Sequence, residues 1–229
     1  MKDLKEYIKE GLFDDVDKLE GKNGLKYNST QLKKEIIDWI VRNTSESVYK
    51  SKFKFDMTTA LITVNYSGSI GFKTNITSLT NGNFQWGYVS GSFNCYNCKS
   101  LTNLEGAPKK VMGDFCCNFC HSLKSLEGAP KEVGRHFVCY YCESLEFLKN
   151  YTEKVGGLFD CSNCKSLKSL EGAPKVVGGD FYCGSCTSLK TLKGSPKEVG
   201  GEFACYNCGT QFTEEYVKQV SNIKRKMYV

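Results

Sequence analysis

The sequence has few of the residues and motifs on which enzymes, membrane proteins and exported proteins rely. Its 229 residues include only two histidines, His121 and His136, and neither has a serine or cysteine at a spacing that suggests a catalytic pair. No G-x-x-x-x-G-K-[S/T] loop and no strand-bounded G-x-G-x-x-G occurs. No stretch reaches the ~18 apolar residues of a membrane helix, and the charged N-terminus lacks the apolar run of a signal peptide. We therefore expect no enzyme, no cofactor, no membrane segment and a cytoplasmic location.

A strict 22-residue repeat occupies the middle of the chain. Phenylalanine recurs with this step at Phe93, Phe115, Phe137, Phe159, Phe181 and Phe203. A C-x-x-C pair follows each phenylalanine and keeps the same step, at Cys95 and Cys98, Cys117 and Cys120, Cys139 and Cys142, Cys161 and Cys164, Cys183 and Cys186, and Cys205 and Cys208. A fixed period of this length is typical of a solenoid, in which each repeat is one coil that stacks on its neighbours.

The positions within one repeat indicate how a coil is built. Phe159 and Cys161 are two residues apart, so a strand would place both on one face. Leu167 and Leu170 are three apart, which suits a single helical or 3₁₀ turn. All four prolines fall at one position of the repeat, where we expect an arc outside the strands. The pattern predicts a narrow apolar core that is shared between coils.

The repeat resembles the leucine-rich repeat, L-x-x-L-x-L-x-x-N/C-x-L. Phenylalanine stands for the second leucine, and the two cysteines stand at the third leucine and at the Asn/Cys position. The C-x-x-C-x-S-L phrase is similar to the cysteine-containing class of this family. The resemblance implies a parallel sheet on the concave side and a binding function, without identifying the ligand. A 22-residue repeat leaves no room for a long helix on the outer arc.

The expected fold is an α+β repeat protein, a short right-handed parallel β-solenoid with caps at both ends. Residues 1–45 should form two helices, the second of which starts at Ser29 or Thr30. Residues 46–92 should form a β-rich cap with a degenerate repeat, in which Ile70, Phe72 and Asn75 replace Phe, Cys and Cys.

The six repeats should span residues 93–212, with a bulge in the third repeat at residues 149–152. A capping helix should follow over residues 213–229. Thr213 is its expected N-cap, and Lys224, Arg225 and Lys226 are expected in its last turn. An uncovered end strand would be able to pair with a second copy of the chain.

The opening K-E-Y-I-K-E-G-L-F-D-D, at residues 5–15, resembles the start of many proteins encoded by bacteriophages of gut bacteria. The same proteins combine such an opening with E-G-A-P-K-x-V-G-G repeats. The resemblance implies a phage product that acts in the cytosol of a bacterial host. In that reducing compartment the thirteen cysteines should be free thiols.

The C-x-x-C pairs allow two interpretations. Their spacing is found in structural zinc sites, so twelve cysteines, Cys95, Cys98, Cys117, Cys120, Cys139, Cys142, Cys161, Cys164, Cys183, Cys186, Cys205 and Cys208, are alternative zinc ligands. The repeat period itself imposes this spacing, however, and a cysteine that shares a strand face with phenylalanine suits an apolar core. We favour core residues and no metal, and keep a zinc-stapled module that binds nucleic acid as the alternative.

Nucleic-acid binding is disfavoured by the charge pattern. Lys109, Lys131, Lys175 and Lys197 share one position of the repeat and would stack as a basic row. Glutamates four residues earlier, at Glu105, Glu127 and Glu171, would form an acidic row beside it and largely neutralise it. The net charge of the chain is only +6.

The expected functional surface is the exposed face of the strands, where residues vary between repeats and aromatic side chains recur. Aromatic residues are enriched at protein-binding hot spots. The candidate protein-binding residues are Asn94, Tyr96, Asp114, His136, Val138, Tyr140, Asp160, Asp180, Tyr182 and Tyr206. The leading prediction is a non-catalytic module that binds a protein partner, such as a host defence factor that it inhibits. A structural or virion-associated phage protein is a third possibility.

Overall fold

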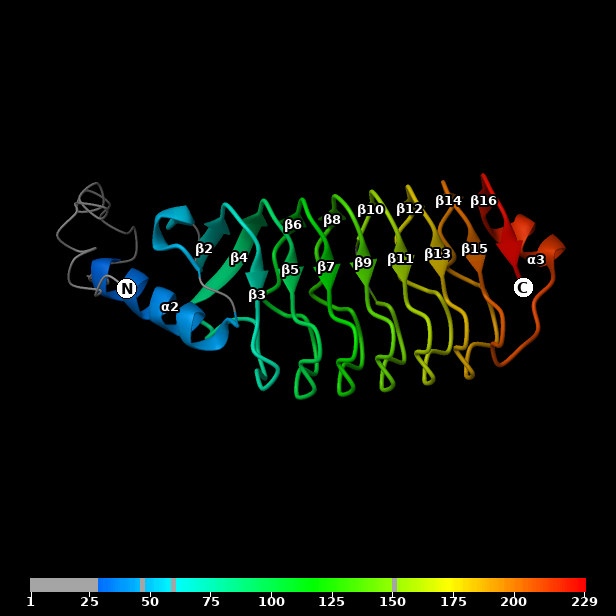
Figure 1. Ribbon diagram of the computed structural model, residues 1–229, viewed down its shortest axis with the longest axis horizontal. Helices are drawn as coiled ribbons and strands as arrows, with labels where there is room; N and C mark the ends of the chain where they lie inside the picture. The colour runs from blue at the N-terminus through cyan, green and yellow to red at the C-terminus, as the bar shows by residue number, and fades with distance from the viewer. Residues whose placement is uncertain (1–28, 46–47, 59–60, 150–151) are drawn as a thin grey trace.

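The computed structural model describes residues 29–45, 48–58, 61–149 and 152–229. It is a short parallel β-solenoid of about eight turns, elongated along the stacking axis, with one helix near each end of the described chain (Figure 1). The predicted fold class is confirmed. Within the described residues, no helix is long and apolar enough to cross a membrane.

Each coil contributes one short strand to each of two sheets. The first sheet has the strand order β1 (Phe53–Asp56), β2 (Ile62–Tyr66), β4 (Phe84–Val89), β6 (Lys110–Val111), β8 (Glu132–Val133), β10 (Lys154–Val155), β12 (Val176–Val177), β14 (Glu198–Val199) and β16 (Asn222–Ile223). The second has the order β17 (Met227–Tyr228), β15 (Phe203–Ala204), β13 (Phe181–Tyr182), β11 (Phe159–Asp160), β9 (Phe137–Val138), β7 (Phe115–Cys116), β5 (Phe93–Asn94) and β3 (Ile70–Gly71). All neighbouring strands are parallel except β1 and β2.

The repeat period sets the register of both sheets. Phe137 pairs with Phe159 and Val133 with Val155, each one period of 22 residues apart. The phenylalanines therefore stack in a ladder inside the solenoid, with ring centroids 5.0–5.7 Å apart between successive coils. Cys161 lies beside Phe159 on the same strand face, and both side chains are fully buried. This arrangement builds the shared apolar core that the spacing predicts.

Glycine joins the two sheets because the coils approach each other closely there. A Cβ on Gly156 would lie 2.1 Å from the carbonyl oxygen of Gly134, and one on Gly178 would lie 2.3 Å from that of Gly156. A side chain at these positions would therefore force the backbones of adjacent coils apart. The V-G-G phrase is thus a packing requirement between coils as well as a turn.

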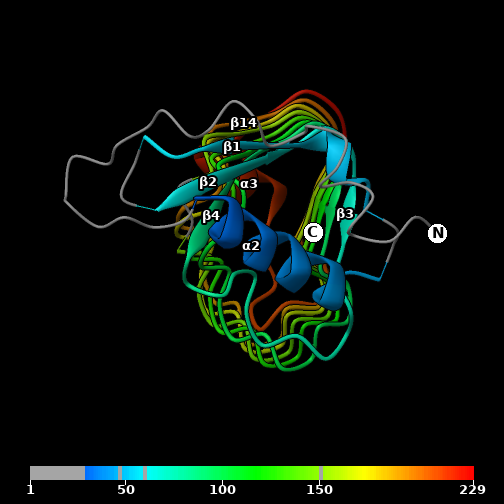
Figure 2. The same ribbon diagram turned by 90° about the vertical axis from the view of Figure 1, so that its left-hand side faces the viewer.

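The N-terminal end of the solenoid is covered. Helix α2 (Ser29–Asn43) lies across the open end of the core, as the view along the axis shows (Figure 2). Its Ile36 and Ile40 are fully buried, and the Trp39 ring meets Phe84 at 5.6 Å. A 3₁₀ turn, η1 (Lys50–Lys52), leads into β1, which closes the edge of the first sheet. The expected second helix and β-rich cap are present, and the expected first helix lies outside the described residues.

The degenerate first coil differs from the prediction in one position. Ile70 pairs with Phe93, as expected, but Asn75 is exposed and the neighbouring Ile76 is buried instead. The shift arises because the spacing to the next coil differs by one residue between the strand and the turn. Ile70 lies 23 residues before Phe93, whereas Ile76 lies 22 residues before Cys98. The apolar isoleucine takes the core position, so the prediction that Asn75 replaces the second cysteine was wrong.

The irregular third repeat keeps its register. Strand β10, which follows the irregular residues, pairs in register with β8 before it and β12 after it. Thr152 is buried, and its hydroxyl donates to the carbonyl of Pro130 in the preceding coil. The expected bulge falls largely on residues 150 and 151, outside the described residues.

The C-terminal cap is shorter than predicted. Thr213 is the N-cap of α3 (Glu214–Val220), as expected, and its hydroxyl accepts from the N–H of Tyr216 at 3.2 Å. The helix ends at Val220, however, and not at Lys226. The next residues form β16 and β17 and complete another coil, because Ile223 comes into register with Val199 and Met227 with Phe203. Burial of these side chains against the coil below accounts for the end of the helix.

Candidate protein-binding surface

The residues predicted to form the exposed strand face are less exposed than expected. Asn94, Val138, Asp160 and Tyr182 are half-buried, and Ala204 in the same row is only 5% exposed. Strands in a sheet lie about 4.8 Å apart, so stacked side chains cover one another along the row. The row is thus a partly covered ladder rather than an open surface.

Three predicted binding residues bond to the backbone of the next coil. The Asp114 carboxylate accepts from the N–H of His136 at 3.1 Å, and His136 Nδ1 accepts from the N–H of Leu158 at 3.0 Å. Asp180 accepts in the same way from the N–H of Glu202 at 2.8 Å. These contacts satisfy backbone donors at the corner between the two sheets. Asp114, His136 and Asp180 therefore have a structural role that the sequence analysis missed.

Asn94 and Asp160 satisfy backbone donors within their own coil. Asn94 Oδ1 accepts from the N–H of Tyr96 at 2.8 Å, and Asp160 Oδ1 accepts from the N–H of Ser162 at 2.9 Å. Burial raises the pKa of Asp160, although its bonds to Ser162 oppose the shift. Both side chains fix the turn that follows the strand, as aspartate and asparagine commonly do.

Tyr182 donates its hydroxyl to Asp180 Oδ2 at 3.1 Å. Burial and the Asp180 carboxylate raise the pKa of Tyr182 to about 12, so its hydroxyl stays protonated at neutral pH. The hydroxyl is engaged within the protein, and Tyr182 offers a partner mainly its ring.

A partly exposed aromatic cluster lies where the second sheet passes into the turn, over the first three repeats. The cluster consists of Tyr96, Phe119, Tyr140 and Tyr141. The Phe119 ring stacks on Tyr141 with centroids 5.1 Å apart and planes 4° apart. Tyr96 and Tyr140 meet Phe119 edge to face, at 5.6 and 5.2 Å. Tyr96 is 47% exposed and Tyr141 38% exposed, so the cluster presents apolar rings to solvent.

Two members of the cluster have a left-handed backbone conformation. The third residue of each C-x-x-C phrase has φ between 53° and 60°, and these residues are Asn97, Phe119, Tyr141, Asn163, Ser185 and Asn207. Asparagine tolerates this conformation, whereas aromatic residues occupy it at a cost of about 1–3 kcal/mol. Phe119 and Tyr141 are the only two aromatic residues in this row, and they occupy adjacent coils.

Tyr96 and Tyr140 were predicted from the sequence as binding residues, whereas Phe119 and Tyr141 were not. A signal for the missed pair was available, because three of the six coils carry asparagine at the same position, and asparagine favours the left-handed conformation. Phenylalanine and tyrosine in such a row depart from the local preference.

Charged side chains border the cluster on its turn side. Glu143 Oε1 lies 3.1 Å from Lys165 Nζ, and Glu143 Oε2 lies 3.7 Å from His121 Nδ1. The His121 ring also meets Phe119 at 6.3 Å. An aromatic centre with a mixed polar rim is the usual anatomy of a protein interface.

Tyr206, the remaining predicted tyrosine, lies apart from the cluster. Its ring covers Gly184 in the coil before it, and the side chain is 47% exposed. Three coils separate Tyr206 from Tyr140, which is roughly 14 Å at the strand spacing of a sheet. The predicted site therefore divides into an aromatic cluster over the first coils and a single tyrosine near the C-terminal end.

The second cysteine of each pair bonds to the backbone one coil back. Cys142 Sγ donates to the carbonyl of Cys117 at 3.1 Å and Cys164 Sγ to that of Cys139 at 3.3 Å. The same bond recurs for Cys98, Cys120, Cys186 and Cys208. Each thiol thus satisfies a carbonyl at the turn while it fills the core.

The cysteine geometry favours protonated core thiols. Burial raises the pKa of the interior thiols, among them Cys117, Cys139, Cys161 and Cys183. Cys120 differs, because S–H donors from Cys95 and Cys98 would stabilise its thiolate and lower its pKa. No group of three or more His, Cys, Asp and Glu side chains in the described part of the chain is placed to hold one metal ion.

The purified protein is accordingly expected to contain no zinc and to yield all thirteen thiols in denaturant. Elemental mass spectrometry and a thiol titration would measure both quantities. In the folded protein Cys116 and Cys208 should react faster than the other thiols, because only these two are half-buried, but slowly, because burial raises the pKa of both. A content of about three zinc ions per chain would contradict this account, since twelve cysteines can hold that number at four ligands each.

The basic row is interrupted on the surface of the solenoid. The backbone N–H of Lys131 donates to the carbonyl of Lys109 and that of Lys197 to the carbonyl of Lys175, so these lysines stack as expected. Glu153 occupies the position between Lys131 and Lys175. Glu171 pairs with Lys193 at 2.7 Å, in its own row rather than with the lysine row. The lysines do not form a continuous track for phosphates.

No family model, no curated protein and no solved structure matches this chain. The solenoid fold therefore rests on the chain's own repeat and its structure. The resemblance to leucine-rich repeats and to phage-encoded proteins stays a prediction.

Proposed function

We propose that this protein is a non-catalytic module that binds a protein partner through the aromatic cluster of Tyr96, Phe119, Tyr140 and Tyr141. The observation that carries the proposal is the stacked pair of aromatic residues held in the left-handed conformation, the half-buried Phe119 and the exposed Tyr141. Folding alone gains nothing from this choice, since Asn97 and Asn163 fill the same position with less strain. Backbone strain concentrates at functional sites, and aromatic side chains dominate binding hot spots.

The finer parts of the proposal rest on the sequence. The repeat phrase supports a solenoid of the cysteine-containing leucine-rich type, and the opening residues support a phage protein that acts in the cytosol of a bacterial host. A module of this kind would bind a host factor, such as a defence protein, and inhibit it by occupying its surface. The interrupted lysine row gives nucleic acid no comparable site.

The proposal is tested by capture from a host lysate on the immobilised protein, with two matched tyrosine substitutions. Tyr96 and Tyr206 are equally exposed, at 47%, but only Tyr96 belongs to the cluster. We expect one host protein to be retained by the wild type and by Tyr206→Ala. We expect Tyr96→Ala to weaken its binding about 30-fold, the usual effect of a hot-spot truncation of about 2 kcal/mol.

Two results would contradict the proposal. Equal retention of the host protein by both variants would place its binding site elsewhere on the molecule. Loss of binding in Tyr206→Ala alone would move the site to the C-terminal coils. The dissociation constants of Tyr96→Ala and Tyr206→Ala should be measured directly with the purified host protein.

A further inference from the structure

At the C-terminal end of the solenoid, where α3 also lies, the two sheets end in strands that have a described partner on one side only (Figure 1). β16 is the last strand of the first sheet and β17 the last strand of the second, and no described strand lies beyond them. At the opposite end α2 lies across the core, and the first sheet ends in the antiparallel strand β1 (Figures 1 and 2). The two ends therefore differ, because only the C-terminal end continues the parallel order of the coils.

The repeat identifies the backbone groups that the open end presents. Between the last two coils, the Val199 carbonyl accepts from the N–H of Lys224 at 3.0 Å, and the Phe203 N–H donates to the Lys226 carbonyl at 2.9 Å. Ile223 pairs with Val199, and Met227 pairs with Phe203. The Ile223 carbonyl and the Met227 N–H are thus the equivalent groups one coil later, and they point away from the last coil. An added strand would bond to such groups.

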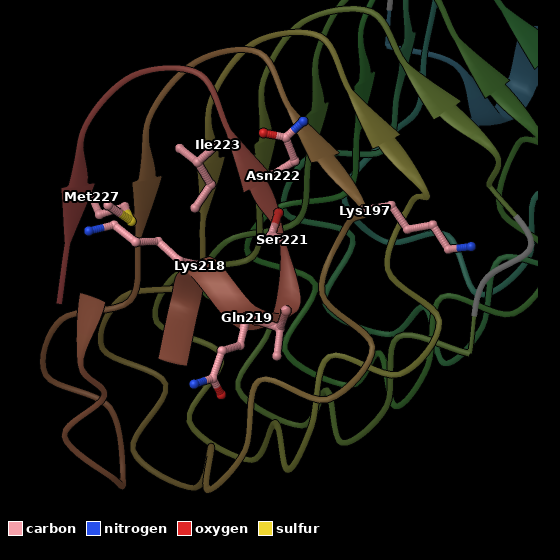
Figure 3. Close-up of a pocket in the computed structure, with 8 residues that line it drawn as sticks. Lys197, Lys218, Gln219, Ser221, Asn222, Ile223 and Met227 are labelled. Atoms are coloured by element: carbon pink, nitrogen blue, oxygen red, sulfur yellow. The ribbon is translucent and has the colours of Figure 1, made fainter. Parts of the chain in front are cut away.

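A pocket of about 450 Å³ lies beside this edge. Half-buried Val220, Ile223 and Met227 supply the apolar part of a lining that is otherwise polar, and the Lys218 side chain lies beside Met227 (Figure 3). The combination suits an apolar side chain that enters the pocket while a carboxylate beside it meets Lys218.

The charges at this end decide which occupant the edge favours. Lys224, Arg225 and Lys226 follow one another between β16 and β17, and all three are exposed. Glu214 pairs with Lys218 at 3.4 Å, and Glu202 accepts from the Tyr228 hydroxyl at 3.5 Å. Two copies that met end to end would place their basic groups against each other, which is how edge strands avoid self-pairing. An acidic segment would be attracted by the same field.

We propose that the open C-terminal end takes up, as part of a next coil along β16 and the turn into β17, an acidic segment of a partner protein that carries an apolar residue among its carboxylates. Backbone bonds to Ile223 and Met227 supply the pairing, the pocket receives the apolar side chain, and the basic residues select the charge. The site lies at the end of the stack, apart from the aromatic cluster. Binding at this end does not depend on whether the aromatic cluster binds a protein.

The test uses the full chain and a short labelled peptide of alternating glutamate and valine, with fluorescence anisotropy at low salt as the readout. The triple substitution Lys224→Glu, Arg225→Glu and Lys226→Glu is expected to weaken binding at least about tenfold, as three partly screened ion pairs would. The matched control, Lys109→Glu, Lys131→Glu and Lys175→Glu, makes the same change in net charge on the side of the solenoid and should leave binding within about threefold of wild type.

Met227→Pro tests the strand pairing independently of charge. Proline removes the outward N–H, while the Lys226 carbonyl that accepts from Phe203 is kept. Met227→Ala is the matched control, because it removes the same half-buried side chain and keeps the N–H. We expect the peptide affinity of Met227→Pro to fall at least about tenfold below that of Met227→Ala. The proposal is overturned if the peptide does not bind at low salt, or if it binds both triple variants equally. It is also overturned if the chain forms a dimer by sedimentation that Met227→Pro abolishes, because the occupant is then a second copy.

Discussion

The protein is expected to unfold between about pH 9 and 10, because its core is built from titratable thiols. Seven deeply buried cysteines have pKa values raised chiefly by burial, and they are Cys117, Cys139, Cys142, Cys161, Cys164, Cys183 and Cys186. In the unfolded chain a cysteine has a pKa of about 8.5. The difference makes folding stability depend on pH.

The sign follows from which state loses protons first. Below pH ~8.5 both states hold the thiol protons, and the full stability is present. Above pH ~8.5 the unfolded chain releases thiol protons that the folded core retains. At one pH unit above this value, each buried thiol lowers the free energy of unfolding by roughly 1.4 kcal/mol. Seven such thiols together cost roughly 10 kcal/mol at pH ~9.5. The total stability of a domain is typically about 5–15 kcal/mol.

Circular dichroism and thiolate absorbance, followed together during an alkaline titration, would measure this effect. Both signals should change in one transition, since ionisation requires unfolding. Cys161→Ala should make the unfolding free energy fall less steeply with pH, by about one released proton, whereas Val155→Ala removes buried apolar atoms but no titrating group and should leave that slope unchanged. Thiolates that form at pH ~9.5 while the helical and strand signals persist would show that the core thiols titrate as exposed groups do.

The double substitution Phe119→Asn and Tyr141→Asn is expected to reduce partner binding about 10³-fold and to leave the protein at least as stable as wild type. Each change places asparagine at a strained position, and asparagine already occupies the equivalent position in two other coils, as Asn97 and Asn163. Relief of the left-handed backbone is worth about 1–2 kcal/mol per residue. Loss of the ring contacts offsets about 1 kcal/mol of this gain. Two hot-spot truncations of about 2 kcal/mol each account for the loss of affinity.

Chemical denaturation and the dissociation constant of the purified complex would report the two effects separately. Ser185→Asn is the control, because it relieves the same backbone conformation outside the cluster and should raise stability without changing binding. If the double variant instead lost more than about 2 kcal/mol of unfolding free energy, the rings would be needed for the fold. Unchanged binding with increased stability would remove the aromatic cluster from the proposed function.

The sequence by itself determined the architecture of this protein. A strict 22-residue period fixes the register of parallel strands, because equivalent residues of successive coils must stack, as Phe137, Phe159 and Phe181 do. The alternation of Phe159 and Cys161 assigned the core face, and the hydroxyl of Thr213 marked the start of α3. Each of these features depends on local chemistry or on the period, and both can be read along the chain.

Only the tertiary structure decided which exposed side chains come together. Phe119 and Tyr141 meet because the same left-handed turn in two adjacent coils lays their rings parallel to each other, and no periodic pattern states the direction of a turn. Asp114 and His136 looked like surface groups in sequence, yet the corner between the sheets leaves backbone donors that they satisfy. The end of α3 was settled in the same way. Helix propensity favoured its continuation through Lys226, but Ile223 and Met227 gain more by packing on the coil below. Local helix propensity can be outweighed by burial against a neighbouring coil only when that coil is in place.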